Sequence, residues 1–249
     1  MRRIILFVIV LGSLQQTLTA QETKKEGKIL KNTFRFNLTN PILFKGSIIF
    51  GYERVLNSRH SFSVNIGTTN FPSTGIHNTD SVQLSKSGDK TGVNFSADYR
   101  FYLAKENKFA APRGVFIGPY YSYNQFNRDN TWMVQSTNGG SPTQVDSELK
   151  LSVHTIGFEM GYQFVFWDRL AVDMVLLGPG IGNYNLKASL GQSLSQADKE
   201  KLFDALNRAL AEKFPGYSVV IDEGEFQTKG TSNTTDLGYR YMVHIGFRF

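Results

Sequence analysis

The sequence predicts an all-β chain that folds as a transmembrane, antiparallel, up-and-down β-barrel of about eight strands. Three observations predict this fold class. Apolar residues recur with a period of two along most of the chain after residue 32, which is typical of strands with one apolar face. No stretch in that part approaches the roughly 18 continuous apolar residues of a membrane-spanning helix. The connections between the alternating segments are mostly short on one side and long and polar on the other, as in membrane barrels.

The first 20 residues have the layout of a signal peptide. Met1-Arg2-Arg3 is a short positive start, residues 4–14 are apolar, and Ala20 precedes an abruptly charged run. As a helix this apolar stretch rises only about 16 Å at about 1.5 Å per residue, which is too short for a membrane anchor. We therefore expect Sec-dependent export and cleavage after Ala20. Residues 21–31 are then a polar periplasmic segment, and residues 32–249 form the barrel.

Composition excludes several other classes of protein. The chain has 249 residues and no cysteine, so disulfide scaffolds, thiolate metal sites and cysteine nucleophiles are excluded. Its aromatic content of 13% and hydrophobic content of 41% are too high for a disordered chain. The net charge of +6 falls by two when Arg2 and Arg3 leave with the signal peptide. The remaining excess is too weak to predict nucleic-acid binding.

Eight segments are predicted strands, and they are residues 34–38, 44–52, 62–66, 93–103, 115–123, 149–166, 170–176 and 237–249. Residues 115–123 are aromatic on both faces, and the others carry the alternation. A tight turn near Asn40-Pro41 joins the first two. The other short connections are residues 57–60, 105–113 and 167–169, and the long ones are residues 70–90, 127–147 and 185–234. In the sixth segment the apolar positions change from odd to even numbers near His154-Thr155, which predicts a β-bulge.

A soluble β-sandwich is the alternative for this pattern. The terminal segment argues against it, because seven alternating apolar or aromatic side chains lead to Phe249, and so do the unequal connections. In hydrocarbon every backbone donor and acceptor must be paired within the protein, so a spanning sheet has to close on itself. The apolar face then contacts lipid and the polar face points into the lumen.

The polar face carries a set of charged side chains that we expect to form a lumen charge cluster, namely Glu53, Asp98, Arg100, Glu159, Asp173, Arg240, His244 and Arg248. Most of them lie within a few residues of a short connection, so they should gather in the periplasmic half. An eight-stranded barrel has a lumen just wide enough for side chains to fill. Opposed carboxylates and guanidiniums there would neutralise one another through charge-assisted bonds. We expect a plug, and a narrow, porin-like pore for small solutes is the alternative.

Catalytic chemistry has little support in the sequence. A serine nucleophile needs a histidine and usually a carboxylate within reach. Ser152 and His154 share one strand, but the apolar pattern changes phase there, so it does not show whether these side chains point inward or outward. His244 should lie most of a membrane thickness away from them. No two histidines have metal-ligand spacing. We therefore expect no catalytic residues, no metal and no cofactor, and a membrane-embedded lipid-modifying enzyme is a second alternative.

The last long connection carries one predicted helix, over about residues 196–214. Ser195 and Asp198 form a start that resembles a capping box, and Pro215-Gly216 ends the run. Its apolar stripe either packs on the loop and covers the barrel mouth or docks a partner. If residues 185–234 contain two more strands, the count becomes ten.

The carboxy-terminal strand resembles the signal read by the outer-membrane barrel assembly machinery, through Tyr241, Val243, Ile245, Phe247 and Phe249. His244 stands where such signals usually carry glycine. Residues 97–102, 114–121 and 161–163 resemble small bacterial outer-membrane barrels of unassigned function, with OmpA/OmpX-type architecture.

This resemblance implies a multi-pass barrel in the outer membrane of a bacterial cell envelope. Its partners would be outer-membrane lipid and lipopolysaccharide, the assembly machinery during biogenesis, and a surface ligand or partner at the helical loop. The resemblance implies no activity. We expect a non-enzymatic protein with a structural or surface-binding role.

Overall fold

The computed structural model describes residues 30–70, 82–135, 141–190, 195, 197–199, 201–202 and 229–249. The elements in these ranges are β1 (Asn32–Asn37), α2 (Thr39–Leu43), β2 (Ile48–Val55), β3 (His60–Thr68), β4 (Val82–Tyr102), β5 (Gly114–Val134), β6 (Thr143–Phe166), β7 (Leu170–Leu177), β8 (Pro179–Leu190), β9 (Lys229–Tyr239) and β10 (Met242–Arg248). The predicted signal peptide and most of the predicted helix lie outside the described residues.

The strands close into an antiparallel barrel of eight strands. Neighbours pair in sequence order from β1 to β6. The long strand β6 then pairs with β7 over its final part and with β8 over an earlier part. In turn β10 pairs with β7 and β9 pairs with β8, and β10 closes the ring on β1. Thus β7 and β8 share one strand position and β9 and β10 share another, which confirms the predicted fold class.

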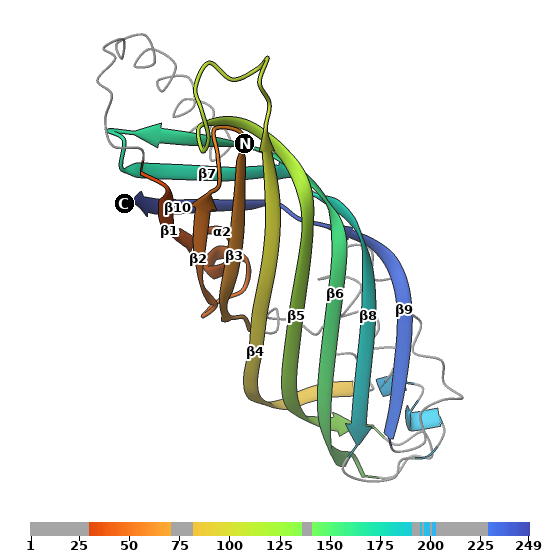
Figure 1. Cartoon of the computed structure of the whole chain (residues 1–249). Helices are drawn as coiled ribbons and strands as arrows, with labels where there is room; N and C mark the ends of the chain where they lie inside the picture. Colours follow the sequence, from red (N-terminus) through yellow and green to blue (C-terminus); the bar gives the residue numbers. More distant parts are fainter. Residues whose placement is uncertain are drawn as a thin grey trace, which may run out of the picture.

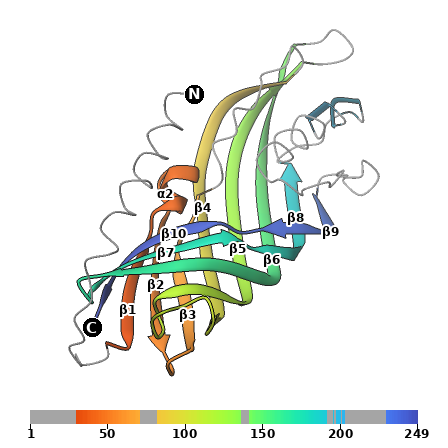
Figure 2. The same cartoon turned by 90° about the horizontal axis from the view of Figure 1, so that it is seen from above.

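The wall of the barrel has two heights. Figure 1 shows β4, β5, β6, β8 and β9 side by side in a curved sheet that continues well beyond β1, β2 and β3. Seen from above in Figure 2, the short strands and α2 lie on one side and the long strands on the other. The last pair between β3 and β4 joins Thr68 to Val93, so β4 continues past the short wall from there.

The long connections are shorter than predicted because the strands extend into them. β4 begins at Val82, β5 ends at Val134 and β6 begins at Thr143. On the last connection, β8 continues to Leu190 and β9 begins at Lys229. These extensions have polar outward side chains, so their composition resembles that of loops. The predicted tight turn near Asn40-Pro41 is also wrong, because residues 39–43 form the helix α2.

The predicted bulge near His154-Thr155 is wrong. Along β6 the apolar side chains change from the inner face to the outer face of the barrel, and this change has the same sequence pattern as a bulge. β5 and β6 pair without a register shift from Gly114↔Gln163 to Val134↔Thr143. Leu151 points inward and is 0% exposed, whereas Phe158 points outward and is 70% exposed. Where the outer face contacts lipid, the apolar residues point outward. Past that zone the outer face is polar and the apolar residues fill the interior, so the pattern changes phase while the backbone stays regular.

The start of β1, the carboxy-terminal Phe249 and the short connections lie at one end of the barrel. Asn32 and Phe249 exchange two backbone hydrogen bonds of 3.1 and 2.9 Å. At the turn between β6 and β7, Trp167 and Asp168 have φ values of 48° and 59°. Two successive positive φ values are typical of the tight hairpin turns that match strand twist.

A close contact between two strands marks the junction of β7 and β8. The Arg240 backbone N–H donates to the Gly178 carbonyl over 2.8 Å, although Arg240 itself lies in the break between β9 and β10. A Cβ atom on Gly178 would lie 2.7 Å from the Arg240 oxygen, so this approach requires glycine. The register shift of β6 against β7 lies beside this junction, opposite Met160 and Gly161. The irregularity therefore lies at Leu176, two residues before Gly178, and not at His154.

The outside of the short part of the barrel is a band of exposed apolar side chains, including Phe34, Phe50, Phe62, Ile66, Phe95, Ile117, Phe158, Ile181, Leu237 and Phe247. Where β10 closes the ring between β1 and β7, the described strands leave no backbone edge facing this band, as a transmembrane sheet requires. Among the helices of the described residues, none has the length and apolar character needed to cross a membrane.

Candidate functional site

The lumen of the short part of the barrel is lined by buried polar residues. They arise directly from the strand period of two, because the residues between outward aromatics must point inward. Arg35 stands between Phe34 and Phe36, and it is fully buried. The ionisable members form what we call the central ion network, which consists of Arg35, Glu53, Asp98, Arg100, Glu159, Asp173, Arg240 and His244.

Arg100 on β4 is the hub of the network. Its Nε lies 2.7 Å from Asp98 Oδ2 and 3.7 Å from Glu159 Oε1. Its Nη2 lies 3.0 Å from Asp173 Oδ2, and its Nη1 lies 3.7 Å from Glu53 Oε1. One guanidinium therefore contacts all four carboxylates of the network, which come from β2, β4, β6 and β7. Its other face packs against the ring of Phe116, with Cζ 4.2 Å from the ring centroid.

Two further arginines connect strand positions that do not pair directly. Arg35 Nη1 on β1 lies 2.6 Å from Asp173 Oδ2 on β7. Arg240 Nη2 lies 3.2 Å from Asp98 Oδ1, and its Nη1 lies 3.5 Å from Glu159 Oε2. The position that β9 and β10 share, where Arg240 lies in the break, is opposite that of β4 in the ring, with three strand positions between them either way. The side chains thus meet across the full width of the lumen.

Asp173 also contacts the buried histidine. His244 Nδ1 lies 3.3 Å from Asp173 Oδ2. The other ring nitrogen of His244 lies 3.3 Å from the Asn37 side-chain amide. His244 therefore belongs to the network through a carboxylate that two arginines share.

Uncharged side chains complete the hydrogen bonding of Glu53. Ser61 Oγ and the Tyr102 hydroxyl donate to Glu53 Oε1 over 2.7 and 3.0 Å. Gln163 Nε2 donates to Glu53 Oε2 over 3.0 Å. Arg35 likewise donates to Ser63 Oγ. A buried carboxylate needs such partners because its desolvation is costly.

The structure brings seven of the eight predicted cluster residues together. Arg248 does not join them, because its Nη1 and Nη2 donate to the backbone oxygens of Asp168 and Leu30 at the end with the short connections. Sequence reasoning missed Arg35, Gln163 and Tyr102. Arg35 could have been found from its place between two outward phenylalanines, whereas Tyr102 and Gln163 look like ordinary strand residues.

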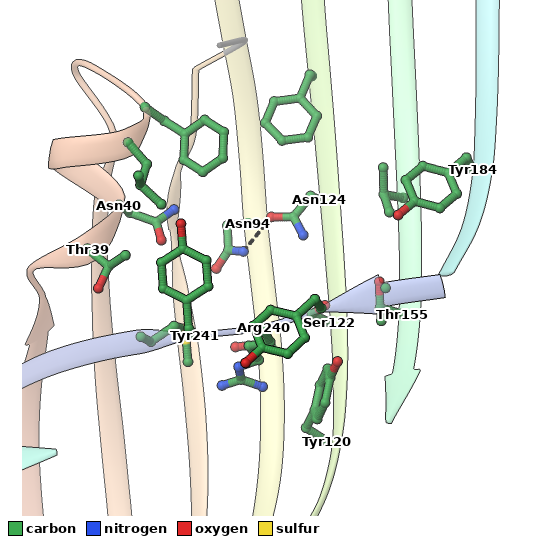
Figure 3. A pocket seen from close by; sticks show the side chains of 18 residues that line it. Thr39, Asn40, Asn94, Tyr120, Ser122, Asn124, Thr155, Tyr184, Arg240 and Tyr241 are labelled. Atoms are coloured by element: carbon green, nitrogen blue, oxygen red, sulfur yellow. Dashed lines mark hydrogen bonds between the residues drawn. The ribbon is translucent and has the colours of Figure 1, made fainter. Parts of the chain in front are cut away.

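A pocket of about 540 Å³ lies above the network, between α2, the break between β9 and β10, and the inner faces of β4, β5, β6 and β8. Arg240 and Tyr120 belong to its lining, and the Arg240 Cζ lies 4.9 Å from the centre of the Tyr120 ring. Figure 3 shows Asn94 and Asn124 side by side on neighbouring strands, joined by a hydrogen bond of 2.6 Å. The pocket is therefore bounded on one side by the central ion network.

The residues considered for catalysis lie elsewhere. Ser152 and His154 are on the outward face of β6, where His154 Nδ1 lies 2.9 Å from the Tyr121 hydroxyl and its ring centroid lies 4.6 Å from that of Tyr123. Among the described residues, no group of three or more histidine, aspartate or glutamate side chains is placed to hold a metal ion.

The carboxy-terminal residues of the predicted assembly signal all lie on the outward face of the closing strand position. They are Tyr241, Val243, Ile245, Phe247 and Phe249. Residues 197–199 and 201–202 are helical, and the Asp198 backbone N–H donates to Ser195 Oγ over 3.3 Å. The rest of the predicted helix lies outside the described residues.

The chain was compared with solved structures, protein-family models and curated protein sequences. A major outer membrane protein from Thermus thermophilus matches with a TM-score of 0.36 and 8% identity, over 89% of this chain and 100% of that one. No protein-family model matches the chain, and neither does any curated protein sequence. The resemblance to OmpA/OmpX-type barrels therefore stays a prediction, and the architecture is that of a closed, eight-stranded transmembrane barrel.

Proposed function

We propose that the chain is a non-enzymatic outer-membrane protein with a structural or surface-binding role, whose central ion network acts as a plug. The observation that carries the proposal is the meeting of Arg240 and Asp98 from opposite sides of the lumen. Every member of the network is at most 8% exposed. Side chains that meet across the lumen and exclude solvent leave no path for hydrated ions.

The charge balance of the network supports a plug over a pore. It contains four carboxylates, three guanidiniums and one imidazole, so opposite charges nearly cancel. Selective pores use rings of one sign of charge to attract one class of ion. A nearly neutral, mutually paired set provides no such attraction, and it cross-links strands that do not pair directly.

The outer-membrane location rests on three features taken together. The sequence begins with the layout of a signal peptide, the barrel has a continuous apolar outer band, and its last strand presents aromatic residues outward to Phe249. We infer that the assembly machinery recognises this strand and that lipid and lipopolysaccharide surround the band. The short connections then face the periplasm and the tall strands face outward.

Conductance in planar lipid bilayers tests the plug. We expect the purified, folded protein to give no current steps beyond those of a bilayer without protein. Steps that change in an Asp98→Asn/Arg240→Gln variant, but not in the exposed turn variant Arg169→Met, would contradict the plug and favour the narrow pore.

Turnover of lipid tests the non-enzymatic part of the proposal. His154 contacts tyrosines and faces outward, and within the described part of the chain no carboxylate pairs with it, as a serine–histidine mechanism usually needs. We expect no hydrolysis or acyl transfer on phospholipid or lipopolysaccharide vesicles. Turnover by the wild-type protein that disappears in Ser152→Ala/His154→Ala would establish an enzyme instead.

A further inference from the structure

We propose that the pocket above the central ion network binds the head group of an uncharged, hydroxyl-rich amphiphile, such as an alkyl glycoside, whose tail leaves through the side of the barrel. This site goes beyond the plug and does not depend on whether the lumen conducts.

The lining combines hydrogen-bonding groups with aromatic rings. Apart from Arg240 and the tyrosines, its polar side chains are Thr39, Asn40, Asn94, Ser96, Ser122, Asn124 and Thr155, none of which carries a charge. Its rings include Phe44, Tyr120, Phe126 and Tyr184. Amide and hydroxyl groups match the hydroxyls of a sugar or glycerol, and aromatic faces match its apolar CH surface. A volume of about 540 Å³ is within the range of small-molecule sites and is large enough for such a head group.

The pocket extends to the outer surface between α2 and the break between β9 and β10. Leu43 and Tyr239 both line the pocket, yet Tyr239 is 55% exposed and Leu43 is also exposed. In the described residues β9 pairs with β8 alone, so no strand covers its other edge. Phe44 reaches across this side to Phe126, with their ring centroids 6.1 Å apart.

The rim of this side opening is apolar and lies at the level of the lipid-facing band. Exposed Ile42 is on the α2 side, and exposed Leu237 and Tyr241 are on the β9–β10 side. A water-soluble ligand would gain nothing from such a rim. An acyl or alkyl tail, by contrast, can pass from the pocket to the bilayer without contacting water.

The charges beneath the pocket favour a neutral head group. Arg240 is the one charged residue in the lining, and it is already paired with Asp98 and Glu159. An anionic head group would approach a network whose carboxylates outnumber its guanidiniums by four to three, and a cationic one would meet Arg240 first.

Tryptophan quenching by a brominated alkyl maltoside tests the site in lipid nanodiscs. The reporter is Phe126→Trp, because Phe126 lines the pocket and is buried from the bulk lipid. The parent protein already contains Trp132 and Trp167, so its fluorescence is subtracted from that of the Phe126→Trp variant to give the signal of the reporter. We expect saturable quenching that unbrominated dodecyl maltoside reverses. A Phe158→Trp reporter on the lipid face should instead show quenching that rises with added ligand and does not saturate.

Two variants in the reporter background separate binding from partitioning. Asn94→Ala/Asn124→Ala should raise the concentration for half-quenching at least about tenfold, a loss expected when paired polar contacts are removed. The outward-facing Gln125→Ala/Asn183→Ala, a matched control, should leave it unchanged. Non-saturable quenching at Phe126→Trp, or equal effects of both double variants, would overturn the site. Conduction through the lumen with intact saturable quenching would overturn the plug and leave this site standing.

Discussion

Arg240 Nη2 and Asp98 Oδ1 lie 3.2 Å apart although their strands occupy opposite positions in the barrel. Arg240 reaches this position because the backbone breaks between β9 and β10, where its N–H bonds to Gly178. The contact links the wall of tall strands to the closing strand position without any backbone pairing between them. The two residues therefore cross-link the lumen, and their coupling can be measured.

A double-mutant cycle on this pair should show strong coupling. We expect Asp98→Asn and Arg240→Gln together to cost less than the sum of the single changes, with an interaction energy of about 0.5–3 kcal/mol, as for residues in one buried network. Reversible urea unfolding in lipid vesicles, read by intrinsic fluorescence, gives the three free energies. Additive costs within about 0.5 kcal/mol would show that the contact contributes nothing of its own.

Removing the hub should be the most damaging single change in the lumen. Arg100→Met keeps much of the side-chain length but leaves four carboxylates without their common partner. Breaking a buried ion pair from one side typically costs about 3–5 kcal/mol. Arg169→Met, in an exposed turn, should cost less than about 1 kcal/mol. Equal unfolding midpoints for the two variants would contradict the role of Arg100.

In the tall part of β6 the apolar side chains point inward and the polar ones outward, so adjacent residues should differ strongly in how much an alanine substitution lowers stability. Leu151 is fully buried in the interior of the tall part, so Leu151→Ala should cost about 2–5 kcal/mol. Ser152, the next residue, faces outward, and Ser152→Ala should change stability by less than about 0.5 kcal/mol. A larger cost for Ser152→Ala than for Leu151→Ala would place the interior on the other face of the strand.

The stability cost of an arginine on the outer face of the barrel should show where the lipid-facing band ends. Phe158→Arg puts a guanidinium on the exposed apolar face, where the cost is about 2–4 kcal/mol near the midplane of the bilayer. Asn183→Arg, on the polar outer face of β8, should cost no more than about 1 kcal/mol. The comparison uses unfolding in vesicles. If both variants lose the same stability, the band does not end between these positions.

Heating should change the mobility of the protein in detergent gels. The ring formed by β1 to β7 and β10 is closed by backbone pairing, so the unboiled protein is expected to keep its fold in detergent and to migrate differently from boiled protein. Arg100→Met should lower the temperature at which the two forms interconvert, whereas Arg169→Met should not. Identical migration of boiled and unboiled wild-type protein, with the chain in the soluble fraction, would point to a sandwich.

Much of the fold was predictable because it depends on local alternation. The sequence around Phe34-Arg35-Phe36 already shows which side chains face lipid, and seven of the eight predicted cluster residues do meet. The predicted bulge at His154-Thr155 failed for a physical reason. Alternation reports which face is apolar, and the environment of each face changes where the strand leaves the bilayer.

The sequence by itself determined the all-β class, the eight strand positions, the end at which the short turns lie and the side of each strand on which the charges project. These follow from a period of two and from turn chemistry, which act between near neighbours. Only the tertiary structure decided which charges pair, how far the tall strands extend, and that α2 and the β9–β10 break enclose a pocket. Such contacts join residues as distant in sequence as Asp98 and Arg240, and closure of the barrel alone brings them together.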